Sequence, residues 1–220
     1  MTKELNLRVL TSIILAIILI FMLNFSVVLI TTLLLIFVIS WLEFNNILEN
    51  IYKKKKNYVF KYIIKFFIFI YLLFFIKIII DEFLQNQPDM SWNLIFIISI
   101  CILTDIGGYI FGKFFRGKKL TKISPNKTYA GMIGSFLLSL IFCFIYSYSI
   151  SFVDFKTIIL ITLLISFISQ LGDLFISYLK RKAKLKDTGN ILPGHGGILD
   201  RIDGILFALP SGIILINYFF

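Results

Sequence analysis

The segment from Lys186 to Asp203 gathers, in one short polar stretch, the residue types that bind phosphate groups and hard cations. Its glycines leave backbone N–H groups unobstructed, as loops that cradle phosphate require. Its carboxylates can hold a hard cation, and its basic side chains can neutralise phosphate oxygens. The chain's one histidine lies between two of the glycines and is either structural or catalytic. The residues are Gly189, Gly194, Gly196 and Gly197, the acids Asp187, Asp200 and Asp203, the bases Lys186 and Arg201, and His195.

A polar stripe on an otherwise apolar stretch precedes this segment. Its members recur at helical spacing and therefore share one helix face, which must meet protein or water rather than lipid. Asp173 in the stripe and Asp105 in an earlier apolar block are functional candidates, because an acid at the centre of a spanning helix costs roughly 2.5–3.5 kcal/mol. The alternatives are a structural acid paired with a lysine or arginine, and a helix contact made of small and polar residues. The stripe consists of Gln170, Asp173, Ser177 and Lys180.

A second basic loop follows the block that contains Asp105. Its end, Ser124-Pro125-Asn126-Lys127-Thr128, predicts a capped turn into the next helix, with Lys127 near the helix N-terminus. A helix N-terminus beside a lysine is a natural anion site, so Lys127 is a candidate phosphate ligand. The other interpretation, a basic loop with an ordinary cap, is the one we favour for Lys118 and Lys119.

The composition indicates a membrane protein. Of the 220 residues, 59% are hydrophobic, and they lie in long blocks separated by short charged stretches. The net charge is +10, and the basic residues lie between the apolar blocks. This placement favours lipid headgroups and anionic substrates over nucleic acid as partners. Cys101 and Cys143 lie inside apolar blocks and predict no disulfide, and the first block carries no recognisable signal-peptide cleavage site.

We therefore predict an all-α fold, a polytopic transmembrane bundle of about seven spanning helices with its active site on the cytoplasmic face. The apolar run 9–40 is too long for one crossing and predicts two short helices with a tight reversal near Asn24-Phe25-Ser26. Residues 1–90 form an N-terminal region of three helices, and residues 91–220 form a catalytic region of four helices and their loops. The remaining helices are expected at roughly 60–80, 92–111, 129–148, 156–179 and 202–219.

The distribution of lysine and arginine predicts the orientation, because cytoplasmic loops carry the excess of these residues. With the N-terminus inside, all of the 22 basic residues except Lys77 and Lys156 fall on the cytoplasmic side. The expected location is a bacterial-type inner membrane.

The run Ser177-x2-Lys180-Arg181-x4-Lys186-Asp187-x-Gly189-x3-Pro193-Gly194-His195-Gly196-Gly197-x2-Asp200-Arg201-x-Asp203 closely resembles the signature of the phosphatidate cytidylyltransferases, the CDP-diacylglycerol synthases. The run ISPNKT at 123–128 and the pair Gly172-Asp173 also resemble motifs of this family. Family members often carry glutamate where this chain has Ile176, so an inactive homologue is a further alternative. The first 90 residues match only as generic membrane helices.

The resemblance implies transfer of CMP from CTP to phosphatidate, giving CDP-diacylglycerol and pyrophosphate. It implies Mg²⁺ as the cofactor, with a second cation left open, membrane lipids as the surroundings, and a homodimer as an open alternative. The catalytic residues would be Asp173, Asp187, Lys180, Arg181 and His195. The metal ligands would be Asp173 and Asp187, with Asp105 in support. The substrate-binding residues would be Ser124, Asn126, Lys127, Ser177, Lys186, Gly196, Gly197, Asp200, Arg201 and Asp203.

Two rival functions fit parts of the same pattern. A CTP-dependent lipid kinase, or a cytidylyltransferase acting on another lipid such as a prenol, would share the membrane architecture. A transporter would place its charged residues near the bilayer midplane and preferably show half-repeats. Here the polar residues gather towards one face and the sequence shows no repeat.

Overall fold

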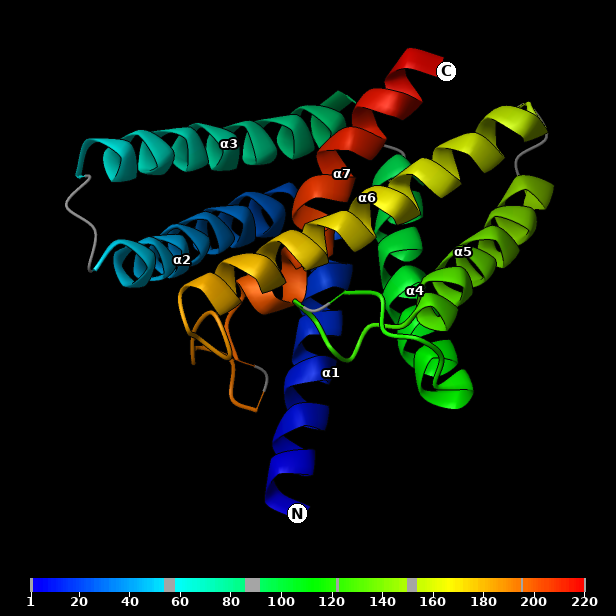
Figure 1. Ribbon diagram of the computed structural model, residues 1–220. Helices are drawn as coiled ribbons and strands as arrows, with labels where there is room; N and C mark the ends of the chain where they lie inside the picture. The colour runs from blue at the N-terminus through cyan, green and yellow to red at the C-terminus, as the bar shows by residue number, and fades with distance from the viewer. Residues whose placement is uncertain are drawn as a thin grey trace. The chain divides into compact units, whose positions relative to one another are not determined.

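The computed structural model describes residues 2–53, 58–85, 92–121, 123–149, 154–194 and 196–219, and their regular structure is entirely helical (Figure 1). The all-α prediction is confirmed over these ranges, which contain only two isolated β-bridges beside the helices. The helices are α1 (Thr2–Asn24), α2 (Ser26–Tyr52), α3 (Tyr58–Gln85), α4 (Trp92–Phe115), α5 (Tyr129–Ser149), α6 (Phe155–Lys182) and α7 (Leu199–Phe219).

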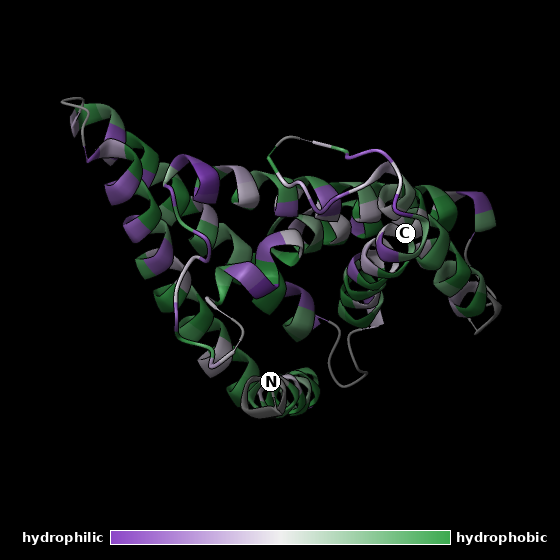
Figure 2. Ribbon diagram, turned by 60° about the horizontal axis from the view of Figure 1, so that its bottom comes forward, coloured by the Kyte–Doolittle hydropathy of each residue, from purple (hydrophilic) through white to green (hydrophobic). Residues whose placement is uncertain are grey.

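Six of these helices, α2 to α7, are long and apolar enough to cross a membrane. Figure 2 shows hydrophobic residues predominating along the helices. The apolar part of α1 is shorter, Val9–Asn24, and spans roughly 24 Å at 1.5 Å per residue, less than the thickness of the hydrocarbon layer. The described residues thus hold six candidate spans and one shorter apolar helix.

The predicted break between the first two helices is confirmed at Phe25, which adopts an extended conformation with φ −129° and ψ 116°. The break is one residue long, because Phe25 ends one helix and begins the next. The predicted tight reversal stays a prediction. The N–H of Phe25 donates to the carbonyl of Phe21 at 2.9 Å, and the N–H of Leu29 donates to the carbonyl of Phe25 at 3.0 Å. The first bond closes the last turn of α1 and the second opens α2, so this one extended residue makes the bend between the two helices.

The helix after this bend runs to Tyr52, well beyond the expected end near residue 40. Two glutamates lie within this extension. Glu49 forms ion pairs with Lys61 at 2.6 Å and Lys65 at 2.9 Å, which join α2 to α3. The other, Glu43, is buried and belongs to the candidate site described below.

The chain divides into two compact units. The first comprises Met1–Ser91 with Leu179–Ile202, and the second comprises Trp92–Tyr178 with Asp203–Phe220. The polar loop between α6 and α7 therefore belongs with the N-terminal helices. In the first unit, α2 and α3 lie side by side (Figure 1).

Glycines hold α4 against α5 in the second unit. A Cβ atom at Gly131 of α5 would lie 2.7 Å from the carbonyl oxygen of Gly108 and 3.4 Å from the Cα of Gly112, both on α4. Gly108 and Gly112 are four residues apart, the spacing that lets the backbones of membrane helices approach closely.

Buried hydroxyl groups join three helices of this unit. Thr104 of α4 hydrogen-bonds Ser166 of α6 at 2.8 Å and Ser139 of α5 at 3.0 Å. Ser135 of α5 donates to the carbonyl of Thr104 at 2.6 Å. Because hydrocarbon offers polar groups no partners, such interhelical hydrogen bonds are favoured within a bundle.

Replacing Gly131 by alanine should destabilise the protein even though alanine is the better helix former. The added methyl group would press on the backbone of Gly108, which cannot move aside as a flexible side chain could. Overpacking of this kind costs roughly 1–3 kcal/mol, so the thermal unfolding midpoint in detergent should fall. The matched control is Gly117→Ala, whose methyl group would sit 3.6 Å from the Cβ of Ala130, an ordinary contact. Equal midpoints for the two variants would contradict the packing described here.

Candidate active site

The loop between α6 and α7 begins with a well-formed helix cap. The N–H of Leu185 donates to the carbonyl of Lys180 at 2.9 Å, and the N–H of Lys184 donates to that of Arg181 at 3.1 Å. This pattern requires a left-handed residue after the helix, and Lys184 supplies it with φ 58°. The cap redirects the chain from α6 into the loop.

Two glycines with positive φ shape the tip of the loop. Gly194 has φ 75° and Gly196 has φ 83°, in a region that glycine enters at little cost. The N–H of Leu192 donates to the carbonyl of Gly196 at 2.9 Å and closes the turn. His195 lies outside the described residues.

Asp200 in the first turn of α7 ties the loop together. Its carboxylate accepts hydrogen bonds from the backbone N–H of Thr188 at 2.8 Å and of Gly197 at 3.1 Å, and it pairs with Lys180 at 2.6 Å. The side chain is only 7% exposed. Asp200 is thus fully engaged in holding the loop, and Lys180 is anchored with it.

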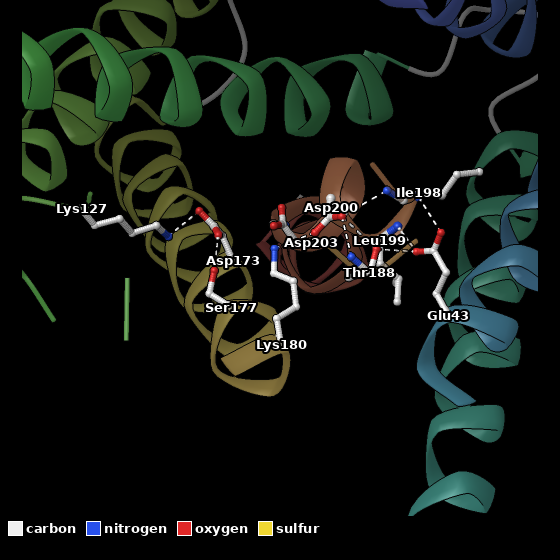
Figure 3. A network of polar contacts seen from close by, with 12 residues as sticks. Glu43, Lys127, Asp173, Ser177, Lys180, Thr188, Ile198, Leu199, Asp200 and Asp203 are labelled. Carbon is white, nitrogen blue, oxygen red and sulfur yellow. Dashed lines mark hydrogen bonds and ion pairs between the residues drawn. The ribbon is translucent and has the colours of Figure 1, made fainter. Parts of the chain in front are cut away.

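A second buried carboxylate, which sequence reasoning missed, approaches the same loop from α2. Glu43 is 4% exposed and accepts hydrogen bonds from the backbone N–H groups of Ile198 and Leu199, both at 2.9 Å (Figure 3). It also accepts one from the hydroxyl of Thr188 at 2.7 Å. These backbone groups lie at the start of α7, where N–H groups lack partners within the helix and attract negative charge.

Two glycines of the loop leave room for Glu43. A Cβ atom at Gly189 or at Gly197 would lie 2.6 Å from its Oε1 atom. A signal for Glu43 was available in the sequence, because it is an acid within an apolar helix. Its partners lie 145 to 156 residues away along the chain, so no local pattern connects them.

The side chains of Arg181, Lys186 and Asp187 are exposed, in contrast to these buried acids. A Cβ atom at Gly196 would lie 3.3 Å from the Cβ of Asp187 and 3.0 Å from Oδ2 of Asp200. The two carboxylates therefore flank Gly196, and Asp187 is the one open to solvent.

In the second unit, Asp173 of α6 forms an ion pair with Lys127 and accepts a hydrogen bond from Ser177 at 3.3 Å (Figure 3). Its partner is thus the lysine of the ISPNKT run. The predicted capped turn is confirmed, since Thr128 accepts a hydrogen bond from the N–H of Gly131 at 3.0 Å. The backbone of Lys127 is fixed as well, because its carbonyl accepts from Leu120 at 2.8 Å.

The other predicted site residues of this unit make backbone contacts or are exposed. Ser124 accepts a hydrogen bond from the N–H of Lys127 at 3.1 Å, whereas Asn126 and Asp105 are exposed. Asp203 accepts from the N–H of Gly204 at 2.8 Å, and Gly172 lets α6 approach it closely, since a Cβ there would lie 2.6 Å from the carbonyl oxygen of Asp203.

No three His, Cys, Asp or Glu side chains form a ready-made metal cage in the described part of the chain. A cation bound by these acids would need oxygen ligands from elsewhere, such as nucleotide phosphates. Arg201, the remaining predicted substrate ligand, is exposed at the start of α7.

These features define a multi-pass helical membrane protein with an ordered, glycine-rich polar loop that carries exposed acidic and basic groups. A model described as the cytidylyltransferase family matches residues 2–219, and the chain belongs to this family.

Curated relatives carry the name phosphatidate cytidylyltransferase. The chain is 46% identical over 139 residues to that of Staphylococcus aureus (strain COL), which covers 61% of the chain and 52% of the relative. It is 42% identical over 139 residues to that of Staphylococcus haemolyticus, with the same coverage. It is 40% identical over 142 residues to that of Bacillus subtilis (strain 168), covering 62% and 53%. The chain spans about half the length of these relatives.

Replacing Lys184 by glycine should stabilise the protein by about 0.5–1 kcal/mol, because glycine adopts the left-handed conformation without strain. Lys182→Gly is the matched control, since it places the same residue inside the last turn of α6 and should cost about 1 kcal/mol. Thermal unfolding in detergent measures both changes. Destabilisation by Lys184→Gly would contradict the cap.

Proposed function

We propose that this protein is a phosphatidate cytidylyltransferase, which transfers CMP from CTP to phosphatidate. The observation that carries the proposal is the ordered loop between α6 and α7. Backbone N–H groups of this loop donate to the buried carboxylates of Asp200 and Glu43, while Lys186 and Asp187 are exposed. The family match covers residues 2–219 and so includes the loop. The names of the curated relatives support the same reaction.

In the proposed reaction, a phosphate oxygen of phosphatidate attacks the α-phosphorus of CTP. A new P–O bond forms, the bond from the α-phosphorus to the oxygen bridging to the β-phosphate breaks, and pyrophosphate leaves with the electron pair. Such transfers depend mainly on alignment of the reactants and on neutralisation of charge.

Lysine and arginine side chains would hold the phosphate groups. Lys127 and Lys180 each have a carboxylate partner, and an ammonium group has three donors, so each keeps donors for phosphate oxygens. Arg181 and Arg201 are exposed and would bind phosphate with the planar fork of the guanidinium. Ser124, Asn126, Ser177 and the glycines of the loop would complete the substrate contacts, and His195 is proposed as a catalytic group.

A divalent cation, with Mg²⁺ the natural choice, would be held by Asp187 or Asp173 together with nucleotide phosphates. Exposed Asp187 suits an ion that arrives with its nucleotide, whereas Asp200 is already engaged by Lys180 and two backbone N–H groups. When bound, the ion would neutralise charge on the phosphates. Asp105 is proposed in support, and a second cation remains open.

The direct test is incubation of purified protein with radiolabelled CTP, phosphatidate and Mg²⁺, followed by lipid extraction. The proposal expects label in the lipid fraction, one pyrophosphate released for each lipid formed, and loss of both with EDTA. Release of CDP with a phosphorylated lipid would instead indicate a CTP-dependent lipid kinase. Incorporation into a prenyl lipid but not into phosphatidate would indicate another acceptor.

Asp173→Asn tests whether this carboxylate takes part in the reaction. The variant keeps the side-chain volume and removes the charge, so it should insert normally but lose roughly 100-fold or more in turnover. It should also need more Mg²⁺. Asp81→Asn, at an exposed acid of α3, is the matched control and should behave as wild type. The measurement is specific activity across a Mg²⁺ titration on protein eluting as one detergent-solubilised peak. Wild-type activity would remove Asp173 from the site and make it only the structural partner of Lys127.

The proposed location is a bacterial inner membrane with the site facing the cytoplasm, where CTP is available. The concentration of basic residues in 112–128 and 180–201 supports this orientation. A reporter active only in the periplasm should therefore be active when fused after Phe220 and silent when fused within 184–190. The reverse pattern would separate the site from its nucleotide and overturn the orientation.

A further inference from the structure

Glu43 is a buried acid of α2, far along the chain from the motifs of the polar loop. Burial of a carboxylate is expensive unless hydrogen bonds replace its water. Its partners are three neutral donors, two backbone N–H groups of Ile198 and Leu199 and the Thr188 hydroxyl. All of them belong to the polar loop or to the first residue of α7.

We propose that Glu43 is a positioning residue for the transfer reaction. Its carboxylate fixes the glycine-rich loop and the start of α7, and so sets the positions of Lys180 and Asp187. The N-terminal helices thereby become part of the catalytic apparatus. The inference rests on the proposed function.

Thr188 transmits this constraint to Asp200. Its hydroxyl lies 2.7 Å from Oε2 of Glu43 and 3.1 Å from Oδ2 of Asp200, and its single hydrogen goes to the nearer acceptor. The backbone N–H of Thr188 donates to Asp200, which in turn pairs with Lys180. Glu43, Thr188, Asp200 and Lys180 therefore form one continuous series of polar contacts.

Glutamine cannot reproduce the contacts of Glu43. Oε1 of the carboxylate accepts from Ile198, and Oε2 accepts from Leu199 and Thr188, so both atoms must be acceptors. An amide has one acceptor oxygen, and in either orientation its NH₂ group would face a backbone N–H. A buried donor would lose its partner, and the loop should loosen.

The first test compares Glu43→Gln with Glu49→Gln, which removes a carboxylate from the same helix at an ion pair outside the site. Displacement of reacting groups by about 1 Å can cost on the order of 100-fold in rate. We expect kcat of Glu43→Gln to fall roughly 10- to 100-fold per folded molecule. KM for phosphatidate should stay unchanged, and Glu49→Gln should retain wild-type kinetics. A purely structural role would reduce the yield of folded protein and leave kcat per folded molecule intact.

A second readout does not depend on activity. Trypsin should cleave Glu43→Gln faster after Lys184 and Lys186 in the loop, while cleavage after Lys118 and Lys119 in the other basic loop stays at the wild-type rate. Mass spectrometry identifies the sites. If the wild type lacks transferase activity, the proposed function fails, whereas this comparison still decides whether Glu43 holds the loop.

If Glu43→Gln does not yield folded protein, variants of Thr188 test whether the contact between Glu43 and Thr188 positions the loop. Thr188→Val removes the hydroxyl and should lower kcat and speed cleavage after Lys186, whereas Thr188→Ser keeps the hydroxyl and should stay near wild type. Wild-type kcat together with wild-type cleavage, in folded Glu43→Gln or in Thr188→Val, would overturn the proposal.

Discussion

The first backbone N–H groups of a helix have no partners within the helix, and at the start of α7 the side chain that satisfies them comes from α2. Glu43 accepts hydrogen bonds from Ile198 and Leu199, and the partial positive charge of the helix N-terminus favours its carboxylate there. Without the start of α7, the carboxylate of Glu43 would be buried without hydrogen-bond partners, and without Glu43 the two N–H groups would be unsatisfied. This mutual requirement explains why residues 179–202 belong to the same compact unit as the N-terminal helices.

The same constraint accounts for the glycines around this contact. Gly189 and Gly197 lie against Glu43, where any side chain would displace the carboxylate. Gly194 and Gly196 serve differently, by adopting positive φ at the tip of the loop. The glycines from which the sequence predicts a phosphate-binding loop therefore also have a structural role. The positions of the exposed side chains of Lys186 and Asp187 depend on the backbone conformation that these glycines permit.

The sequence predicted those parts of the structure that local patterns determine. Hydropathy located the helices from α3 to α7 to within a few residues, because a membrane span is defined by its own composition. The cap at Thr128 was predicted because the residues that make it are neighbours. The extent of α2 was not, because the apolar run ends near residue 40 while the helix continues to Tyr52. The pairing of Asp173 with Lys127 likewise depends on how α6 packs near the start of α5, which no spacing along the chain reveals.

A carboxylate from α2 caps α7 and orders the loop before it. Amide hydrogen exchange of Ile198 and Leu199 in the wild-type protein tests it most directly, because an amide that donates to a buried acceptor exchanges only when the structure opens. Both amides should exchange as slowly as that of Leu206 in the interior of α7, although amides at a helix start usually exchange fast. Exchange of either amide at the rate of an exposed loop residue such as Ile191 would contradict it.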